Sequence, residues 1–269
     1  MNTSPLTTRT RRYALGLEYD GSCFNGWQIQ EGVPTVQETL ETALGRVADH
    51  RVRVITAGRT DTGVHALGQV VHFDTIADRP EVSWLRGTNA NLPESVAVTW
   101  VKAVDDDFHA RFSASLRAYR YVILSRSVPP TYLSRKVTWT HQSLDDLRMA
   151  AAAEYLVGRH DFSAYRSVHC QSKQPVRDVQ KLVLGRSGAW IWFDIQADGF
   201  LHHMVRNIAG VLMTIGSGAR SVDWSREVLM SRDRRCGGVT APPDGLYLSE
   251  VHYPANFQMP EPPAPCRYW

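Results

Sequence analysis

Asp61 is the side chain in this sequence that is best placed to do chemistry. It lies at the centre of Gly58-Arg-Thr-Asp-Thr-Gly-Val-His-Ala66, where Gly58 and Gly63 permit tight turns and the close approach of a ligand. A nearby arginine such as Arg59 would keep the carboxylate ionised and available as a nucleophile or base. Asp61 could equally bond its own backbone in an Asx turn, and the local residues leave both interpretations open.

A second candidate segment, residues 108–121, combines basic and aromatic side chains. Arg117, Tyr119 and Tyr121 alternate within it, so they would share one face of a strand. Side by side, such groups can stack a nucleic-acid base and hold its phosphate. The alternative is a half-buried strand whose tyrosines pack into the core.

A third candidate segment, residues 199–212, is an apolar helix interrupted by Arg206 and Asn207. A buried arginine needs a carboxylate partner, because an unpaired buried charge is costly. Asp61 is a candidate partner, and a structural salt bridge elsewhere is the alternative. His202 and His203 are adjacent, so on a helix we expect them to point in different directions and to form no metal pair.

The composition indicates a globular protein without a membrane span. Hydrophobic residues make up 43% of the 269 residues, and no apolar run approaches the roughly 20 residues that a bilayer requires. The N-terminal residues are polar and lack the apolar region of a signal peptide, so we expect a cytoplasmic protein. The four scattered cysteines disfavour a zinc site, and no nucleotide-binding motif is present. We therefore expect chemistry that needs no cofactor and no metal.

Positive charge is concentrated locally, although the net charge is only +3. Residues 109–144 and 162–177 contain no acidic side chain but several basic ones, and Arg232, Arg234 and Arg235 form a third cluster. Such clusters suit a polyanionic partner such as RNA, because each phosphate contact releases counterions. Solvated surface faces are the alternative.

Hydrophobic periodicity predicts a similar order of elements in each half of the chain. In the first half we predict a capping box at Thr35 and Glu38 that starts a helix. The predicted elements there are strands over 13–19, 51–57, 69–74 and 96–104 and helices from 35 and over 83–91. In the second half they are strands over 116–124, 179–184, 189–195 and 246–253 and helices over 143–157 and 200–215.

Each half therefore has the order β-α-β-β-α-β, which is typical of a ferredoxin-like unit. The predicted fold class is α+β, with two tandem ferredoxin-like, RNA-recognition-like domains, mainly antiparallel sheets and a central cleft. The predicted boundaries are a disordered basic arm over 1–10, domains over 11–105 and 106–254, and a proline-rich extended tail over 255–269.

The chain resembles the tRNA pseudouridine synthase A family in five blocks that occur in the family's order. Three of them are GRTDTGVHA, FHARFSASLRAYRY and HHMVRNIAG, which contain the candidates above. The other two are Tyr19-Asp-Gly-Ser-Cys-Phe-Asn-Gly-Trp-Gln28 and Gly238-Val-Thr-Ala-Pro-Pro-Asp-Gly-Leu-Tyr-Leu248. The resemblance covers roughly residues 11 to 254.

The resemblance implies conversion of uridine to pseudouridine at positions 38, 39 and 40 of the tRNA anticodon arm, by a homodimer. By the same resemblance Asp61 is the nucleophile, Tyr119 lies against the target base, Arg206 pairs with Asp61, and Arg59 helps to flip the base out. We expect the substrate also to contact a wider set of residues, namely His65, Arg111, Arg117 and Asn207.

Two other functions fit the residues less well. A tandem RNA-binding module without catalysis would normally carry an aromatic-glycine signature in its strands, which is missing. A hydrolase acting on RNA normally needs a second carboxylate, a histidine or a metal, and only His65 is near Asp61 in sequence.

Overall fold

The computed structural model describes residues 10–269, and its strands form one ten-stranded sheet. The predicted arm over 1–10 lies outside the described residues except for Thr10. The elements of the first half are β1 (Arg11–Tyr19), α1 (Val36–Ala48), β2 (Val54–Thr56), β3 (His65–Thr75), α2 (Glu81–Asn89) and β4 (Val96–Val104), with a short 3-10 turn η1 (Gly21–Cys23).

The second half contains more elements than the sequence predicts. They are β5 (Leu116–Ser125), β6 (Thr138–Thr140), α3 (Asp146–Glu154), β7 (Gly158–Asp161), β8 (Val176–Ser187), β9 (Trp190–Ala197), α4 (Met204–Gly216), α5 (Trp224–Ser231) and β10 (Leu246–His252). Three 3-10 turns, η2 (Ser163–Tyr165), η3 (Arg234–Cys236) and η4 (Ala255–Phe257), complete the half.

The sheet runs in the order β4-β1-β3-β10-β5-β9-β8-β7, with β2 paired to β3 and β6 paired to β5. Most pairs are antiparallel, and β3–β10 and β5–β6 are parallel. The predicted mixed fold with mainly antiparallel strands is therefore confirmed. The two halves join through β3 and β10, where His65 faces Tyr247 and Ala66 faces Leu248.

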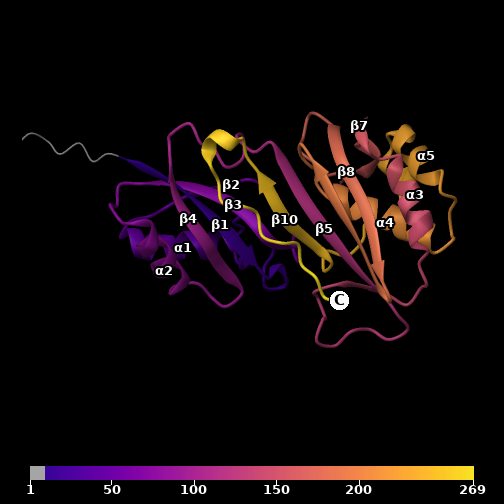
Figure 1. Cartoon of the computed structure of the whole chain (residues 1–269), viewed down its shortest axis with the longest axis horizontal. Coiled ribbons are helices and arrows are strands. Elements are labelled where there is room, and N and C mark those ends of the chain that lie inside the picture. The colour runs from indigo at the N-terminus through magenta and orange to yellow at the C-terminus, as the bar shows by residue number, and fades with distance from the viewer. Residues whose placement is uncertain (1–9) are drawn as a thin grey trace, which may run out of the picture.

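The main core lies between the sheet and the helices. Along β9, Ile191, Phe193 and Ile195 are fully buried on one face because strand side chains alternate between faces. Helix α4 is apolar almost all round and packs into the same core. Figure 1 shows α1 and α2 beside the strands of the first half and α3, α4 and α5 beside those of the second.

A smaller core lies on the opposite face of β9, under the C-terminal segment. Trp190 and Trp192 belong to that face, and the ring of Trp269 stacks on Trp192 with centroids 4.0 Å apart. Tyr268 stacks on Trp190 and hydrogen-bonds the Tyr247 hydroxyl at 2.8 Å. In Figure 1 the yellow C-terminal segment runs beside β10 to the marked C-terminus, and its last residues pack on the tryptophans of β9, so the predicted proline-rich tail is extended but docked.

Several predicted boundaries are wrong for identifiable reasons. The helix predicted over 200–215 begins at Met204, because His203 takes a left-handed backbone conformation with φ of 62°. The predicted capping box does not form: α1 starts after Thr35 as expected, but the Thr35 hydroxyl makes no cap bond and is buried without a partner. Helix α3 ends at Glu154, before the positive-φ Gly158 opens β7.

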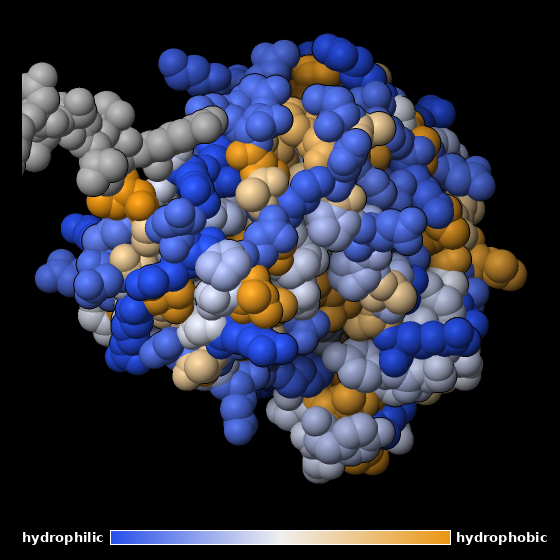
Figure 2. Space-filling model, turned by 60° about the vertical axis from the view of Figure 1, so that its left-hand side comes forward, coloured by the Kyte–Doolittle hydropathy of each residue, from blue (hydrophilic) through white to orange (hydrophobic). Residues whose placement is uncertain are grey.

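Exposed apolar side chains form no large continuous patch on the face drawn in Figure 2. On the face in Figure 2, hydrophobic residues lie in small groups among hydrophilic ones. Among residues 10–269, no helix has both the length and the apolar character to cross a bilayer.

The docked tail generates a stability prediction. We expect Trp269→Ala to lower the free energy of unfolding by about 1–3 kcal/mol, because it removes the ring that covers Trp192 and lies over Arg120. Urea denaturation measures the change, and Tyr132→Ala, at a side chain that is 81% exposed, is the control. If both variants are as stable as the wild type, the C-terminal tail does not pack against the sheet in solution.

Candidate active site

The loop that carries Asp61 connects β2 to β3 and is fixed by buried neighbours. Gln69 donates a hydrogen bond from Nε2 to the carbonyl of Gly58 at 2.8 Å. The amide of Trp27 donates to the carbonyl of Thr60 at 3.0 Å, and the Thr60 hydroxyl lies 2.8 Å from that of Tyr19. No hydrogen bond joins the Asp61 carboxylate to backbone among the described residues, so the Asx-turn alternative is not what the structure contains.

Gly26 lets another part of the chain approach this loop closely. Its φ is +89°, and a Cβ atom placed on it would lie only 2.9 Å from the carbonyl oxygen of Thr60. Both the dihedral angle and the space therefore require glycine. The backbone at Thr60, directly before Asp61, therefore packs against the backbone at Gly26 and Trp27.

The Asp61 carboxylate faces three side chains from the second half of the chain. Arg206 places Nη1 3.3 Å from Oδ2, and His202 and His203 place their Nε2 atoms 3.4 and 3.5 Å from Oδ1 and Oδ2. Arg206 is itself held by a 2.9 Å hydrogen bond from Nε to the carbonyl of Ala241. The structure therefore contains the ion pair predicted between Asp61 and Arg206, together with two histidines that were not predicted.

These neighbours keep Asp61 ionised. Burial opposes the charge, but the hydrogen bond from His202 and the charge of Arg206 help to outweigh burial, and the pKa of the carboxyl is lowered. The contact with Asp61 raises the pKa of His202, whereas burial lowers the pKa of His203. Asp61 is thus a carboxylate at neutral pH, and it stabilises the protonated form of His202.

The prediction that His202 and His203 diverge is wrong. Neither residue lies in α4, since the left-handed conformation of His203 directly precedes its first turn. Both rings turn to Asp61 instead, with centroids 4.0 Å apart. The amide of Ser167 donates to the carbonyl of His202 at 2.8 Å and holds this bend.

The same three side chains could hold a metal ion. One atom each of Asp61, His202 and His203 lie within 4.8 Å of one another, and two histidines with one carboxylate are a familiar ligand set for transition metals. The expectation of metal-free chemistry therefore stays a prediction.

Tyr119 lies in β5, buried, with its ring edge-on to Phe200 at a centroid distance of 5.0 Å. Burial, and the nearby Tyr19 and Asp61, raise the pKa of its hydroxyl, which therefore stays protonated. That hydroxyl has no hydrogen-bond partner among the described residues, which leaves it available to a ligand.

Arg117 and Asn207 brace the backbone around the site. Arg117 donates to the carbonyl of Ala57, at the start of the Asp61 loop, and to three further carbonyls. Asn207 is buried and donates to the carbonyl of Tyr165 at 2.7 Å. Their polar groups are directed at protein atoms.

His65 is not brought to the Asp61 carboxylate. It is 2% exposed, its Nδ1 accepts from the amide of Gly21 at 3.1 Å, and its Nε2 lies 3.0 Å from the carbonyl of Arg135. Its ring stacks on Tyr247 at the joint between the halves. These are the contacts of a structural residue.

Arg59 and Arg111 are exposed, and each lies close in sequence to a backbone carbonyl that Arg117 holds. Arg59 lies within the Asp61 loop and has no polar partner among the described residues, while Arg111 lies over the ring of Phe112. Both guanidinium groups remain accessible to an anionic ligand.

The chain is similar to known tRNA-modifying proteins. A family model described as tRNA pseudouridine synthase matches residues 17–113 and 152–254. Proteins named tRNA pseudouridine synthase A from Pseudomonas aeruginosa and Nitrosococcus oceani are both 57% identical, over 93% and 96% of this chain and 88% and 100% of their own lengths. One from Alcanivorax borkumensis is 55% identical over 94% of this chain and 95% of its own length.

The pairing of His202 with Asp61 generates a titration prediction. Because Asp61 raises the pKa of His202, this pair stabilises the fold below pH ~6.5, and the contribution is lost as pH rises through the folded pKa of His202. In Asp61→Asn the pKa of His202 should fall and that pH-dependent contribution should vanish.

Nuclear magnetic resonance titration of the histidine side chains measures this shift. His72, whose pKa burial lowers to about 4, is the internal control, since Asp61 is not among the groups that act on it. An unchanged His202 titration in the variant would contradict the pairing.

Proposed function

The chain belongs to the tRNA pseudouridine synthase family, and from this membership and the surroundings of Asp61 we propose that it isomerises uridine to pseudouridine at positions 38, 39 and 40 of the tRNA anticodon arm. Asp61 is the nucleophile in this proposal. The observation that carries it is an ionised, partly buried carboxylate, 23% exposed, that an arginine and two histidines orient from the other half of the chain.

The isomerisation of uridine to pseudouridine needs a nucleophile and groups that transfer protons, and the residues around Asp61 can supply both. The bond between N1 of the base and C1′ of the ribose breaks, a bond between C5 and C1′ forms, and a proton leaves C5 while another joins N1. No electron pair or group is exchanged with a second reactant. A carboxylate that attacks and groups that carry a proton are sufficient, and attack at C6, attack at C1′ and a glycal route all use an ionised Asp61.

Tyr119 is proposed to lie against the target base and to take part in proton transfer. Its buried ring offers a flat apolar surface for stacking, and its hydroxyl is free of protein partners among the described residues. The base must leave its stack to reach Asp61, at a cost of a few kcal/mol. We propose that Arg59, exposed beside the loop, fills the vacated space, while Arg111 holds a phosphate. The contacts of Arg117, Asn207 and His65 support an indirect role instead, through positioning of the backbone.

The finer description of the fold is also a proposal. The strand orders β4-β1-β3-β2 and β10-β5-β9-β8 are the same order, 4-1-3-2, when each set is numbered along the chain. This supports two tandem ferredoxin-like domains over 11–105 and 106–254. We propose that the anticodon arm binds in a central cleft between them. We further propose a homodimer that works in the cytoplasm and needs no cofactor and no metal.

The central test is the loss of one carboxylate. We expect Asp61→Asn to reduce pseudouridine formation in unmodified tRNA by more than about a thousandfold, because the amide cannot act as the nucleophile. Carbodiimide-dependent primer-extension stops map the product, and fluorescence anisotropy should show retained tRNA binding. Asp107→Asn, at an exposed carboxylate, is the matched control.

The reactions are run in excess EDTA and should proceed unchanged there. Cleaved tRNA would point to a hydrolase, and binding without modification by the wild type would leave only an RNA-binding module. Activity lost in EDTA and restored by a divalent ion would assign a metal to Asp61, His202 and His203.

A second variant separates stacking from proton transfer at Tyr119. Tyr119→Phe keeps the ring and removes only an unpartnered hydroxyl, so it should fold normally and lower the single-turnover rate by about 10²–10⁴-fold. Tyr132→Phe, at an exposed position, should react like the wild type. Near-normal turnover of Tyr119→Phe would leave this tyrosine a stacking role alone.

A further inference from the structure

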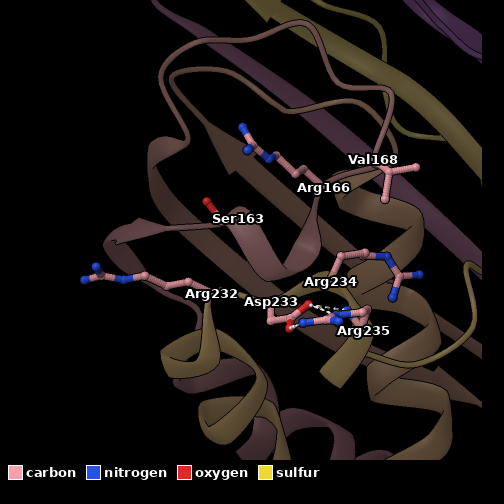
Figure 3. A pocket seen from close by; sticks show the side chains of 7 residues that line it. All are labelled: Ser163, Arg166, Val168, Arg232, Asp233, Arg234 and Arg235. Atoms are coloured by element: carbon pink, nitrogen blue, oxygen red, sulfur yellow. Dashed lines mark hydrogen bonds and ion pairs between the residues drawn. The ribbon is translucent and has the colours of Figure 1, made fainter.

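A cavity rich in arginine lies beside α4, away from the Asp61 carboxylate itself. It has a volume of about 430 Å³ and is lined by Ser163, Arg166 and Val168 from one segment and by residues 232–235 from another. Four of the seven lining residues are arginines and one is aspartate. Figure 3 shows these side chains around the cavity, with Arg235 joined to Asp233.

Much of the positive charge here is not neutralised by the protein. Asp233 forms an ion pair with Arg235, with 2.6 Å between Oδ2 and Nη2, and so does not neutralise the other arginines. Arg232 is 70% exposed and only reaches within 3.6 Å of Asp161. Arg166 donates to the carbonyl of Ser172, a neutral group. Arg166 and Arg234 therefore contact only neutral groups among the described residues, and the exposed Arg232 keeps one long contact with Asp161, so positive charge remains available to an anion.

Hydrogen bonds connect both walls of the cavity to the proposed active site. From one wall, Arg234 donates to Asn207 at 3.1 Å, and Asn207 directly follows the arginine that pairs with Asp61. From the other wall, Ser167 holds the backbone of His202. A ligand in the cavity would thus touch the two segments that line it, and both of these segments are hydrogen-bonded to the stretch of chain, residues 202–207, that faces Asp61.

The form of the cavity indicates an extended anion. In Figure 3 the guanidinium groups of Arg166, Arg232 and Arg234 are directed to different sides, which suits successive charges along a chain better than one small ion. Guanidinium groups match phosphate oxygens in geometry, and Val168, 80% exposed at the rim, offers an apolar contact for a sugar or base.

We propose that this arginine pocket binds the sugar–phosphate backbone of the tRNA strand that carries the target uridine. The inference rests on the proposed function, because it takes tRNA as the substrate of Asp61. Phosphates held here would fix the register of the strand, so that the neighbouring nucleotide reaches the carboxylate.

The test removes two charges that make few protein contacts. Arg166→Gln/Arg232→Gln leaves Arg234 and the Arg235–Asp233 pair intact. Its tRNA dissociation constant, measured by anisotropy at several salt concentrations, should rise about tenfold, and the salt dependence of binding should fall by roughly one or two counterions.

Arg51→Gln/Arg53→Gln is the control with the same loss of charge, at two exposed arginines of the first half. Its dissociation constant should rise much less than that of the pocket variant. Equal weakening by both variants would show a diffuse electrostatic effect and overturn the proposal, as would wild-type binding by the pocket variant.

Single methylphosphonates in an anticodon stem-loop RNA locate the contact. A neutral linkage beside the target uridine should weaken binding to the wild type but add little in Arg166→Gln/Arg232→Gln, because the same contact is already lost. If the losses of binding free energy from the methylphosphonate and from the protein variant add fully at every phosphate beside the target, the proposal is overturned. A site for a small anion would also overturn the proposal. Calorimetry would reveal it if the wild type binds inorganic phosphate at micromolar concentration and the double variant loses this binding while its tRNA affinity is unchanged.

The two proposals can fail separately. If the wild type forms pseudouridine and the pocket variant binds tRNA normally, the pocket is wrong and the function stands. If the wild type forms no pseudouridine but the pocket variant alone loses tRNA binding, the pocket contact stands and the function is wrong.

Discussion

The charge contact between Asp61 and Arg206 is the interaction on which the geometry of the candidate site depends. The carboxylate comes from a loop of the first half, whereas its arginine comes from the first turn of α4 and its two histidines from the residues just before that helix. A partly buried charge without its partner is costly, so neither half offers a favourable setting for its own member of the pair. The site is therefore a property of the joined molecule.

The sheet makes that joint rigid. Asp61 lies four residues before His65, which pairs with Tyr247 and stacks on it. The short parallel pairing of β3 with β10 thus fixes the start of β3, and with it the end of the Asp61 loop. His65 contributes here as a buried spacer between the halves, which explains why a residue so close in sequence to Asp61 makes no contact with its carboxylate.

Local patterns predicted the parts of this arrangement that local chemistry determines. Alternation of apolar and polar residues identified β1 and β2, and the cost of a buried charge led from Arg206 to Asp61. The two histidines were missed because the first residue of α4 is set by a tertiary contact, the bond from Ser167 to His202, and no pattern near residue 202 reveals it. β6 and β7, of three and four residues, are too short to show a period. The docked tail depends on Trp190 and Trp192 being uncovered on the outer face of β9, which becomes apparent only once the strand's neighbours are known.

The position of β10 has a consequence for how the protein is made. This strand, Leu246–His252, is the last in the sequence, yet it lies in the middle of the sheet between β3 and β5. Until it has emerged from the ribosome, β3 and β5 both present open edges that attract other strands. Contacts between segments so distant along the chain also form slowly. The first half can acquire its structure early in synthesis, but the second half lacks its fourth strand until β10 has emerged, so the joint that holds the carboxylate against its partners forms late.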